Sequence, residues 1–173
     1  MSAEVGSWSA KAEEIHRRAA NAYFPGCVDA GRVVSAEDAA FLKSIGIPLQ
    51  MVLDYVEDFT RGGEPDLETF VSVVGIRREY FLDELRGVWP DREVPERDLP
   101  LKSEELDGIA WLPRIIRKAG CFLDGTLCRE VMYGCSGDRG FLKRHGSDLP
   151  GFLKLVRDHR ANDAAIVRHM RGL

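Results

Sequence analysis

The sequence lacks the motifs of the common cofactor enzymes. It contains no G-x-G-x-x-G or Walker loop for nucleotide phosphates, no H-E-x-x-H zinc motif and no G-x-S-x-G nucleophile turn. C-x-x-C is also missing, which excludes a thioredoxin-like redox pair and the paired knuckles of structural zinc sites. We therefore expect neither a cofactor nor a metal centre. A zinc site built from isolated ligands, with His145 among them, is the less favoured alternative.

Long apolar runs and an excess of positive charge are absent as well. No run approaches the ~18 apolar residues of a membrane helix, and the first twenty residues lack the apolar core of a secretory signal. The chain carries 24 Lys and Arg against 28 Asp and Glu, a formal net charge of −4. It therefore lacks the excess of positive charge with which proteins attract the phosphates of nucleic acid. We expect a cytoplasmic protein, with reduced thiols, that binds neither membranes nor nucleic acid.

The charge is distributed unevenly along the chain. Residues 1–108 contain 12 Lys and Arg against 22 Asp and Glu, a net charge of −10, whereas residues 109–173 contain 12 against 6, a net charge of +6. One interpretation is that the two halves pack together and partly neutralise each other. The other is that the basic half holds an anionic ligand.

The spacing of apolar residues predicts an all-α fold of seven or eight short helices. In the first half, helices are expected over 10–24 after Ser9, from Ser35 to a stop at Gly46, from Pro48 to Gly62, and from Asp66 to about Arg86. In the second half, they are expected from a first turn that contains Pro113 to an end at Asp124 and Gly125, after a cap at Ser136, from Pro150, and after a cap at Asn162.

Prolines interrupt the pattern between the two halves. Pro90, Pro95 and Pro100 lie among charged residues in the segment 88–107. Prolines at this spacing keep a chain extended. The sequence therefore predicts two packed helical subdomains, an acidic one over 1–88 and a basic one over 108–173, joined by a proline-rich linker over 89–107.

Three of the four cysteines, Cys121, Cys128 and Cys135, follow one another at intervals of seven. Asp124 and Gly125 interrupt any helix between the first two, so the interval does not place the thiols on one helix face. Cys135 differs because it directly precedes the expected cap Ser136, where its sulfur would face unpaired helix amides that stabilise a thiolate. It is either a nucleophile, for which no histidine stands at a diagnostic spacing, or a small thiol packing a tight turn.

The second half also resembles a known family. The family's pattern consists of three motifs, L-P-R-x-I-x-K-A, G-T-L and Y-x-C-x-x-D-x-x-F. In this sequence they correspond, in order, to Leu112 to Ala119, Gly125 to Leu127 and Tyr133 to Phe141. On these residues the chain resembles a bacterial domain-of-unknown-function family, and its first half resembles an extension of some members through SIG, DYVED, GGEP and RREYF. The resemblance implies no activity. Of the cysteines, only Cys135 matches the pattern.

The matched polar residues form the candidate site. Arg114 and Lys118 are four residues apart on one helix face, where they repel each other unless an anion lies between them. We interpret Arg114, Lys118 and Arg139 as ligand-binding residues. We interpret Tyr133, Cys135 and Asp138 as catalytic residues. The acidic residues Asp54, Glu57 and Asp58 are either part of a site or structural.

Two kinds of function are favoured by the sequence, ahead of nucleic-acid binding by the basic C-terminal segment. The first is a site between the two halves for a small anionic metabolite, a carboxylate or phosphate, with acid/base or thiol chemistry. The second is a non-catalytic helical interaction module whose halves are joined by ion pairs. Neither enzymatic activity nor a homo-oligomer is decided by the sequence.

Overall fold

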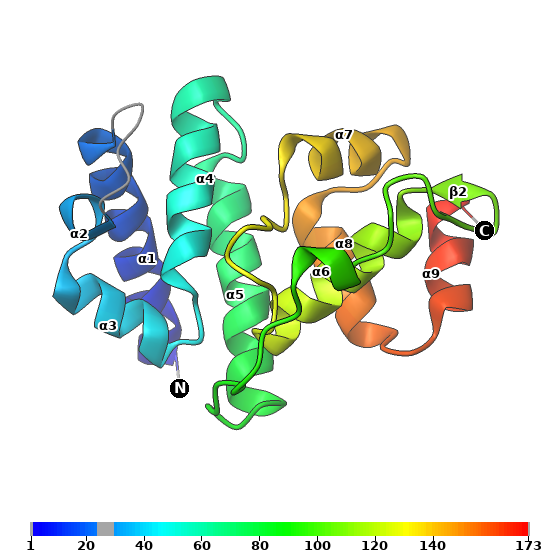
Figure 1. The fold of residues 1–173 in the computed structure, drawn as a ribbon. Helices are drawn as coiled ribbons and strands as arrows, with labels where there is room; N and C mark the ends of the chain where they lie inside the picture. Colours follow the sequence, from blue (N-terminus) through cyan, green and yellow to red (C-terminus); the bar gives the residue numbers. More distant parts are fainter. Residues whose placement is uncertain (1, 24–29, 173) are drawn as a thin grey trace. The chain divides into compact units, whose positions relative to one another are not determined.

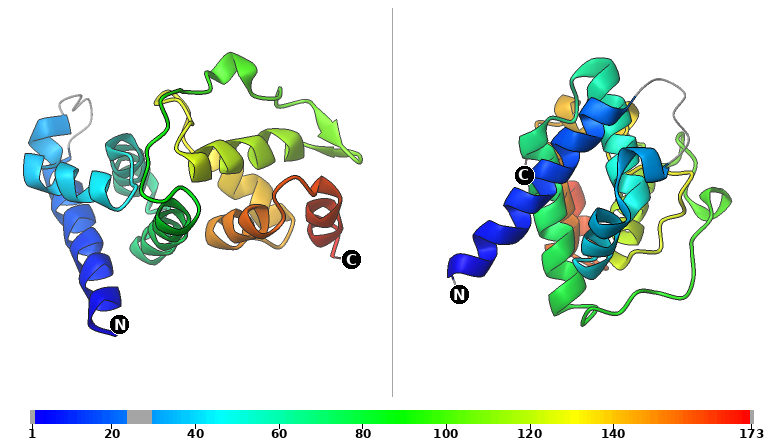
Figure 2. Two further views of the ribbon diagram at one scale, coloured as in Figure 1. Left: turned by 90° about the horizontal axis from the view of Figure 1, so that it is seen from below. Right: turned by 90° about the vertical axis from the view of Figure 1, so that its left-hand side faces the viewer.

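A computed structural model describes residues 2–23 and 30–172 of the chain. Most of these residues are helical: they form nine α-helices and one pair of two-residue strands, which confirms the all-α prediction (Figures 1 and 2). The chain divides into two compact units, residues 1–87 and 88–173, each of which is described by itself. The proline-rich segment 88–107 belongs to the second unit.

The first unit contains five helices, and α1 packs against α4 and α5 (Figure 1). Their bounds are α1 Ser2–Ala22, α2 Ala30–Val33, α3 Ala36–Ser44, α4 Leu49–Gly62 and α5 Leu67–Asp83. The core between them is apolar and includes Val52, Tyr55, Phe70 and Val73, all fully buried. The helices thus bury the apolar stripes that their sequences predict.

Two predicted caps of the first unit are confirmed. The Ser35 side chain accepts a hydrogen bond from the Asp38 amide, and the Asp66 side chain accepts one from the Thr69 amide. Gly46 follows α3 with a φ of 80°, and a Cβ at this position would lie 2.3 Å from the Phe81 ring. The turn after α3 therefore requires glycine both for its backbone conformation and for the close packing of Phe81.

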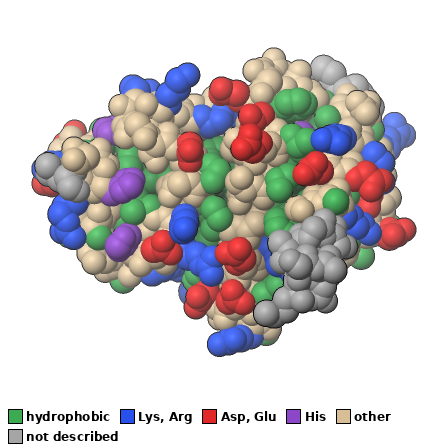
Figure 3. Space-filling view, turned by 180° about the vertical axis from the view of Figure 1, so that it is seen from behind, with side chains coloured by type: hydrophobic (Ala, Val, Ile, Leu, Met, Phe, Trp, Pro, Cys, Tyr) green, Lys and Arg blue, Asp and Glu red, His purple; other side chains and the backbone are tan. Residues whose placement is uncertain are grey.

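The second unit contains a β-hairpin and four helices. Its elements are β1 Glu105–Leu106, β2 Ile109–Ala110, α6 Leu112–Asp124, α7 Ser136–Arg144, α8 Leu149–Asp158 and α9 Asp163–Met170, preceded by a 3-10 turn at Glu96–Asp98. Helix α8 packs against α6 and α7. The segment 88–107 runs along α6 on its side opposite α8 and α9 (Figure 2). Seen from behind, the surface of this unit shows histidine side chains beside hydrophobic ones (Figure 3).

Several boundaries differ from the sequence-based expectation. Helix α1 begins at Ser2 rather than after Ser9, because serine and glycine lower helix propensity without stopping a helix; Phe24, at the expected end, lies outside the described residues. Helix α5 ends at Asp83, before Arg86. The short helix α2 and the hairpin were not expected. The N-cap of α7 is Cys135, and Ser136 is already helical.

In the described ranges, no single helix is long and apolar enough to cross a membrane. The pair α3 and α4, bent by 111°, meets the criterion for a broken span by length and composition only.

Candidate functional site

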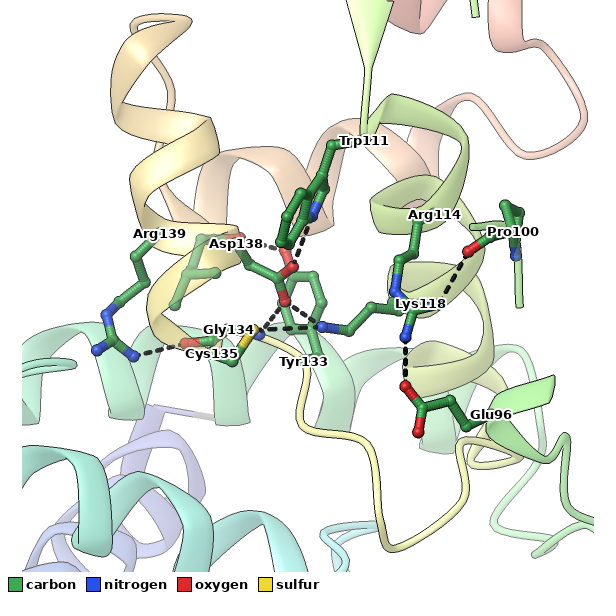
Figure 4. A network of polar contacts seen from close by, with 11 residues as sticks. Glu96, Pro100, Trp111, Arg114, Lys118, Tyr133, Gly134, Cys135, Asp138 and Arg139 are labelled. Atoms are coloured by element: carbon green, nitrogen blue, oxygen red, sulfur yellow. Dashed lines mark hydrogen bonds and ion pairs between the residues drawn. The ribbon is translucent and has the colours of Figure 1, made fainter. Parts of the chain in front are cut away.

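Helices α6 and α7 bring three of the predicted site residues together. Lys118 Nζ, on α6, lies 2.5 Å from Asp138 Oδ2 and 3.6 Å from Cys135 Sγ at the start of α7 (Figure 4). The side chains of Lys118 and Asp138 are 4% and 0% exposed, so the ion pair is buried. Because Lys118 contacts both the carboxylate and the sulfur, it is the centre of this group.

The Asp138 carboxylate is held from two further directions. The indole Nε1 of Trp111 donates to Oδ1 at 3.1 Å, and the Gly134 amide donates to Oδ2 at 3.0 Å. Both oxygens therefore accept hydrogen bonds in addition to the Lys118 contact. A buried carboxylate with this many donors is well satisfied, which offsets the cost of removing it from water.

Trp111 is a site residue that the sequence analysis missed. It is the N-cap of α6 and has a φ of 74°, an uncommon backbone conformation for a bulky residue. Its ring lies against α7, where a Cβ on Gly137 would come within 2.8 Å of two ring atoms. No local pattern pairs a tryptophan with an aspartate 27 residues later. The one available signal was its position directly before the L-P-R motif.

Cys135 is the partly exposed member of the three described cysteines. It occupies the N-cap of α7 without a side-chain capping bond, since the Asp138 carboxylate reaches back to Gly134 instead. The Cys135 sulfur thus lies at a helix N-terminus, beside an ammonium group and partly exposed, which is an electropositive position of the kind that reactive cysteines occupy. Chemically, this arrangement suits a nucleophilic or redox-active thiol.

The other two described cysteines are structural. Cys121 and Cys128 lie with Leu99 and Val131 in an apolar cluster of the second unit. Burial raises the pKa of Cys128, and the nearby Glu130 carboxylate adds to this. Both cysteines are free thiols. Within the described ranges, no three His, Cys, Asp or Glu side chains are grouped as a metal ion would require.

The remaining three predicted residues bind protein groups. Tyr133 Oη donates to the Leu149 carbonyl oxygen at 2.9 Å, and Arg139 Nη1 donates to the Gly134 carbonyl oxygen at 2.7 Å, turned away from Lys118 (Figure 4). Arg114 reaches a different partner from Lys118: it donates to Pro100 O at 2.8 Å and to Glu96 Oε1 at 2.7 Å. Arg114 thereby ties α6 to the segment 88–107.

The acidic residues Asp54, Glu57 and Asp58 lie on α4 in the first unit. Burial raises the pKa of Asp54 to about 6, against a hydrogen bond from Gln50 that lowers it, and the charges of Glu57 and Asp58 raise it further. Glu57 forms an ion pair with Arg61 at 2.6 Å, one turn further along. These carboxylates belong to a different unit from the Lys118 group.

Comparison with known proteins finds no matching family model, no matching curated protein and no matching solved structure. The family resemblance in the second half therefore stays a prediction.

Proposed function

We propose that the second unit holds a small-molecule site centred on Cys135, where the sulfur performs thiol chemistry on a metabolite with a carboxylate or phosphate group. The observation that carries this proposal is the 3.6 Å contact between Lys118 Nζ and Cys135 Sγ at the N-terminus of α7. Lys118 supplies positive charge beside the sulfur, and the helix dipole adds to it. Reactive cysteines of enzymes lie in partly exposed, electropositive surroundings of this kind.

The proposed place for the anionic group is the first turn of α7. The Ser136 and Gly137 amides have no hydrogen-bond partner among the described residues, because the N-cap side chain forms no capping bond. Amides at a helix N-terminus bind carboxylates and phosphates through hydrogen bonds and the helix dipole. In this proposal Cys135 is the reacting residue, while Lys118, Asp138 and Trp111 position it. Arg114, Tyr133 and Arg139 stabilise the surrounding backbone.

The location and origin follow as part of the proposal. A reactive thiol without a disulfide partner persists in a reducing compartment, so we propose a cytoplasmic protein. The resemblance of the second half supports a bacterial one.

The experiment that tests the proposal is alkylation of the native chain with iodoacetamide, with the rate at each cysteine followed by mass spectrometry. We expect Cys135 to react faster than Cys121 and Cys128, and the double variant Lys118→Met/Asp138→Asn to slow it at least about tenfold, because the ammonium is lost without leaving a buried charge unpaired. The buried Cys121 and Cys128 serve as internal controls, because their rates report any unfolding that the variant causes. If Cys135 reacts no faster in the native chain than in urea, the proposal is wrong.

A second function is favoured by a specific observation. Lys118 and Asp138 neutralise each other in a buried pair, and Arg114, Tyr133 and Arg139 all donate to backbone carbonyls. These contacts suit a non-catalytic helical interaction module in which the polar residues serve stability. In that case Cys135→Ser lowers the free energy of unfolding, and the native Cys135 shows no enhanced alkylation rate.

A further inference from the structure

The second unit also contains a cleft of about 270 Å³, formed by α6, the end of α8 and the start of α9. Its floor is apolar: Val156 and Ile166 are buried, and Ile116 is partly buried. Polar side chains surround this floor, among them Arg117, His159, Arg160 and Asp163. None of the lining residues belongs to the Cys135 site.

One wall of the cleft is fixed by Arg160. Its Nη1 donates to the Gly120 carbonyl oxygen at 3.1 Å, and its Nη2 contacts both carboxylate oxygens of Asp124, at 2.8 and 2.7 Å. A Cβ on Gly120 would lie 3.0 Å from Arg160 Nη1, so the glycine makes room for the guanidinium against α6. The contact holds the loop between α8 and α9 on α6, and Asp124 offsets the charge of Arg160.

Two further side chains at the cleft carry opposite charges and have no partner among the described residues. Arg117 on α6 and Asp163 at the start of α9 both line it, and both are exposed. Neither forms a hydrogen bond or ion pair through its side chain with the other, or with any other described residue. A cation and an anion therefore face one apolar-floored cleft without a partner.

We propose that this cleft binds a small zwitterion of the class of an apolar α-amino acid. The ligand carboxylate pairs with Arg117, its ammonium group pairs with Asp163, and its aliphatic side chain lies on Ile116, Val156 and Ile166. A purely anionic ligand would be repelled by the Asp163 carboxylate. An amine without a carboxylate would be repelled by the Arg117 guanidinium. A zwitterion satisfies both charges and the apolar floor together.

The test is a titration of the ¹⁵N-labelled chain, followed by NMR, with three probes of similar shape: L-leucine, 4-methylpentanoate and isopentylamine. We expect L-leucine to shift the amides of Gly120, Ala161 and Asp163 in a saturable way, and to bind at least about fivefold more tightly than either singly charged probe. Arg117→Gln and Asp163→Asn are exposed substitutions that preserve the fold. Each should weaken L-leucine binding about tenfold, because each removes one charged hydrogen bond.

Arg129→Gln is the matched control, since Arg129 is an exposed arginine of the same unit that does not line the cleft; it leaves the affinity for L-leucine unchanged. Equal binding of 4-methylpentanoate and L-leucine overturns the proposal in favour of a simple anion site. Shifts that do not saturate, or that persist unchanged in both variants, overturn it altogether. Cys135→Ser has no effect on this titration, which keeps its result separate from the thiol proposal.

Discussion

Lys118 Nζ and Asp138 Oδ2 lie 2.5 Å apart in a buried ion pair that joins α6 to α7. The sequence places Arg114 and Lys118 on one helix face, where they repel each other unless an anion lies nearby. The protein itself supplies that anion for Lys118, and Glu96 supplies one for Arg114. The two cations thus serve different contacts, and only Lys118 contacts the cysteine.

Removing one partner of the Lys118 and Asp138 pair should destabilise the second unit strongly. Lys118→Met leaves a buried carboxylate without its counterion, and we expect a loss of about 3 kcal/mol in the free energy of unfolding. Lys118→Met/Asp138→Asn should cost less than Lys118→Met alone, because no buried charge is then left unpaired. Urea unfolding of both single variants and the double variant gives the coupling energy. Additive losses would show that the two side chains do not interact.

Gly137 is expected to be intolerant of a side chain although it lies inside a helix. The added methyl group of Gly137→Ala would lie 2.8 Å from the Trp111 ring, so Trp111 must move and its hydrogen bond to Asp138 is weakened. We expect a loss of about 1 to 3 kcal/mol in thermal or urea unfolding. The same substitution normally stabilises a helix by up to about 1 kcal/mol.

Gly140→Ala is the control in the same helix. The nearest atom to its Cβ would be Arg144 Nη1 at 3.5 Å, the end of a flexible side chain, so the helix-propensity gain should remain. If both alanine variants stabilise the chain equally, the Trp111 ring does not constrain α7.

Helix boundaries were predictable where local chemistry sets them. Ser35, Asp66 and Asn162 each accept a hydrogen bond from an amide in the first turn of the following helix, as their residue types predict. Gly125 ends α6 with a φ of 73°, also as expected. At α7 the same reasoning selected Ser136, a good cap residue, yet the cap is Cys135. Here Asp138 binds the Gly134 amide and thereby determines where the helix begins.

The partners of the site residues were not predictable from local pattern. The spacing placed Arg114 and Lys118 on one face of α6, but their partners lie 18 and 20 residues away in opposite directions along the chain. Trp111 reaches Asp138 across 27 residues. Such contacts depend on how α6 and α7 pack, which periodicity does not describe.

His16 should make the first unit sensitive to acid. The side chain is 1% exposed, packs against the rings of Phe59 and Phe70, and its Nε2 has no hydrogen-bond partner among the described residues. Burial, aided by the charge of Arg17, lowers the pKa of His16 to about 4. Between pH 6.5 and 4 the unfolded chain therefore binds the proton first, and stability is lost as the pH falls.

Replacing His16 with leucine should remove this loss. Between neutral pH and about pH 5, the titration of His16 lowers the free energy of unfolding of the natural chain by about 2 kcal/mol. The difference in free energy of unfolding between His16→Leu and the natural chain should change by that amount over the same interval. Urea unfolding at several pH values measures it. A pH-independent difference would mean that His16 titrates alike in the folded and unfolded chains.

Asp54 should act in the opposite direction within the same unit. Its pKa is raised to about 6, chiefly by burial, so the native chain holds a proton there that the unfolded chain releases at lower pH. Stability from this group is complete below its unfolded pKa and is lost as the pH rises through about 6. Asp54→Asn, which keeps the carboxyl shape without the charge, should therefore stabilise the chain at neutral pH and have little effect in acid.

Urea unfolding of Asp54→Asn and His16→Leu across one pH series compares the two groups directly. As the pH changes, the free energies of unfolding of the two variants, each relative to the natural chain, must change with opposite sign. A gain from Asp54→Asn that is equal at both ends of the series would contradict a titrating carboxyl at this position.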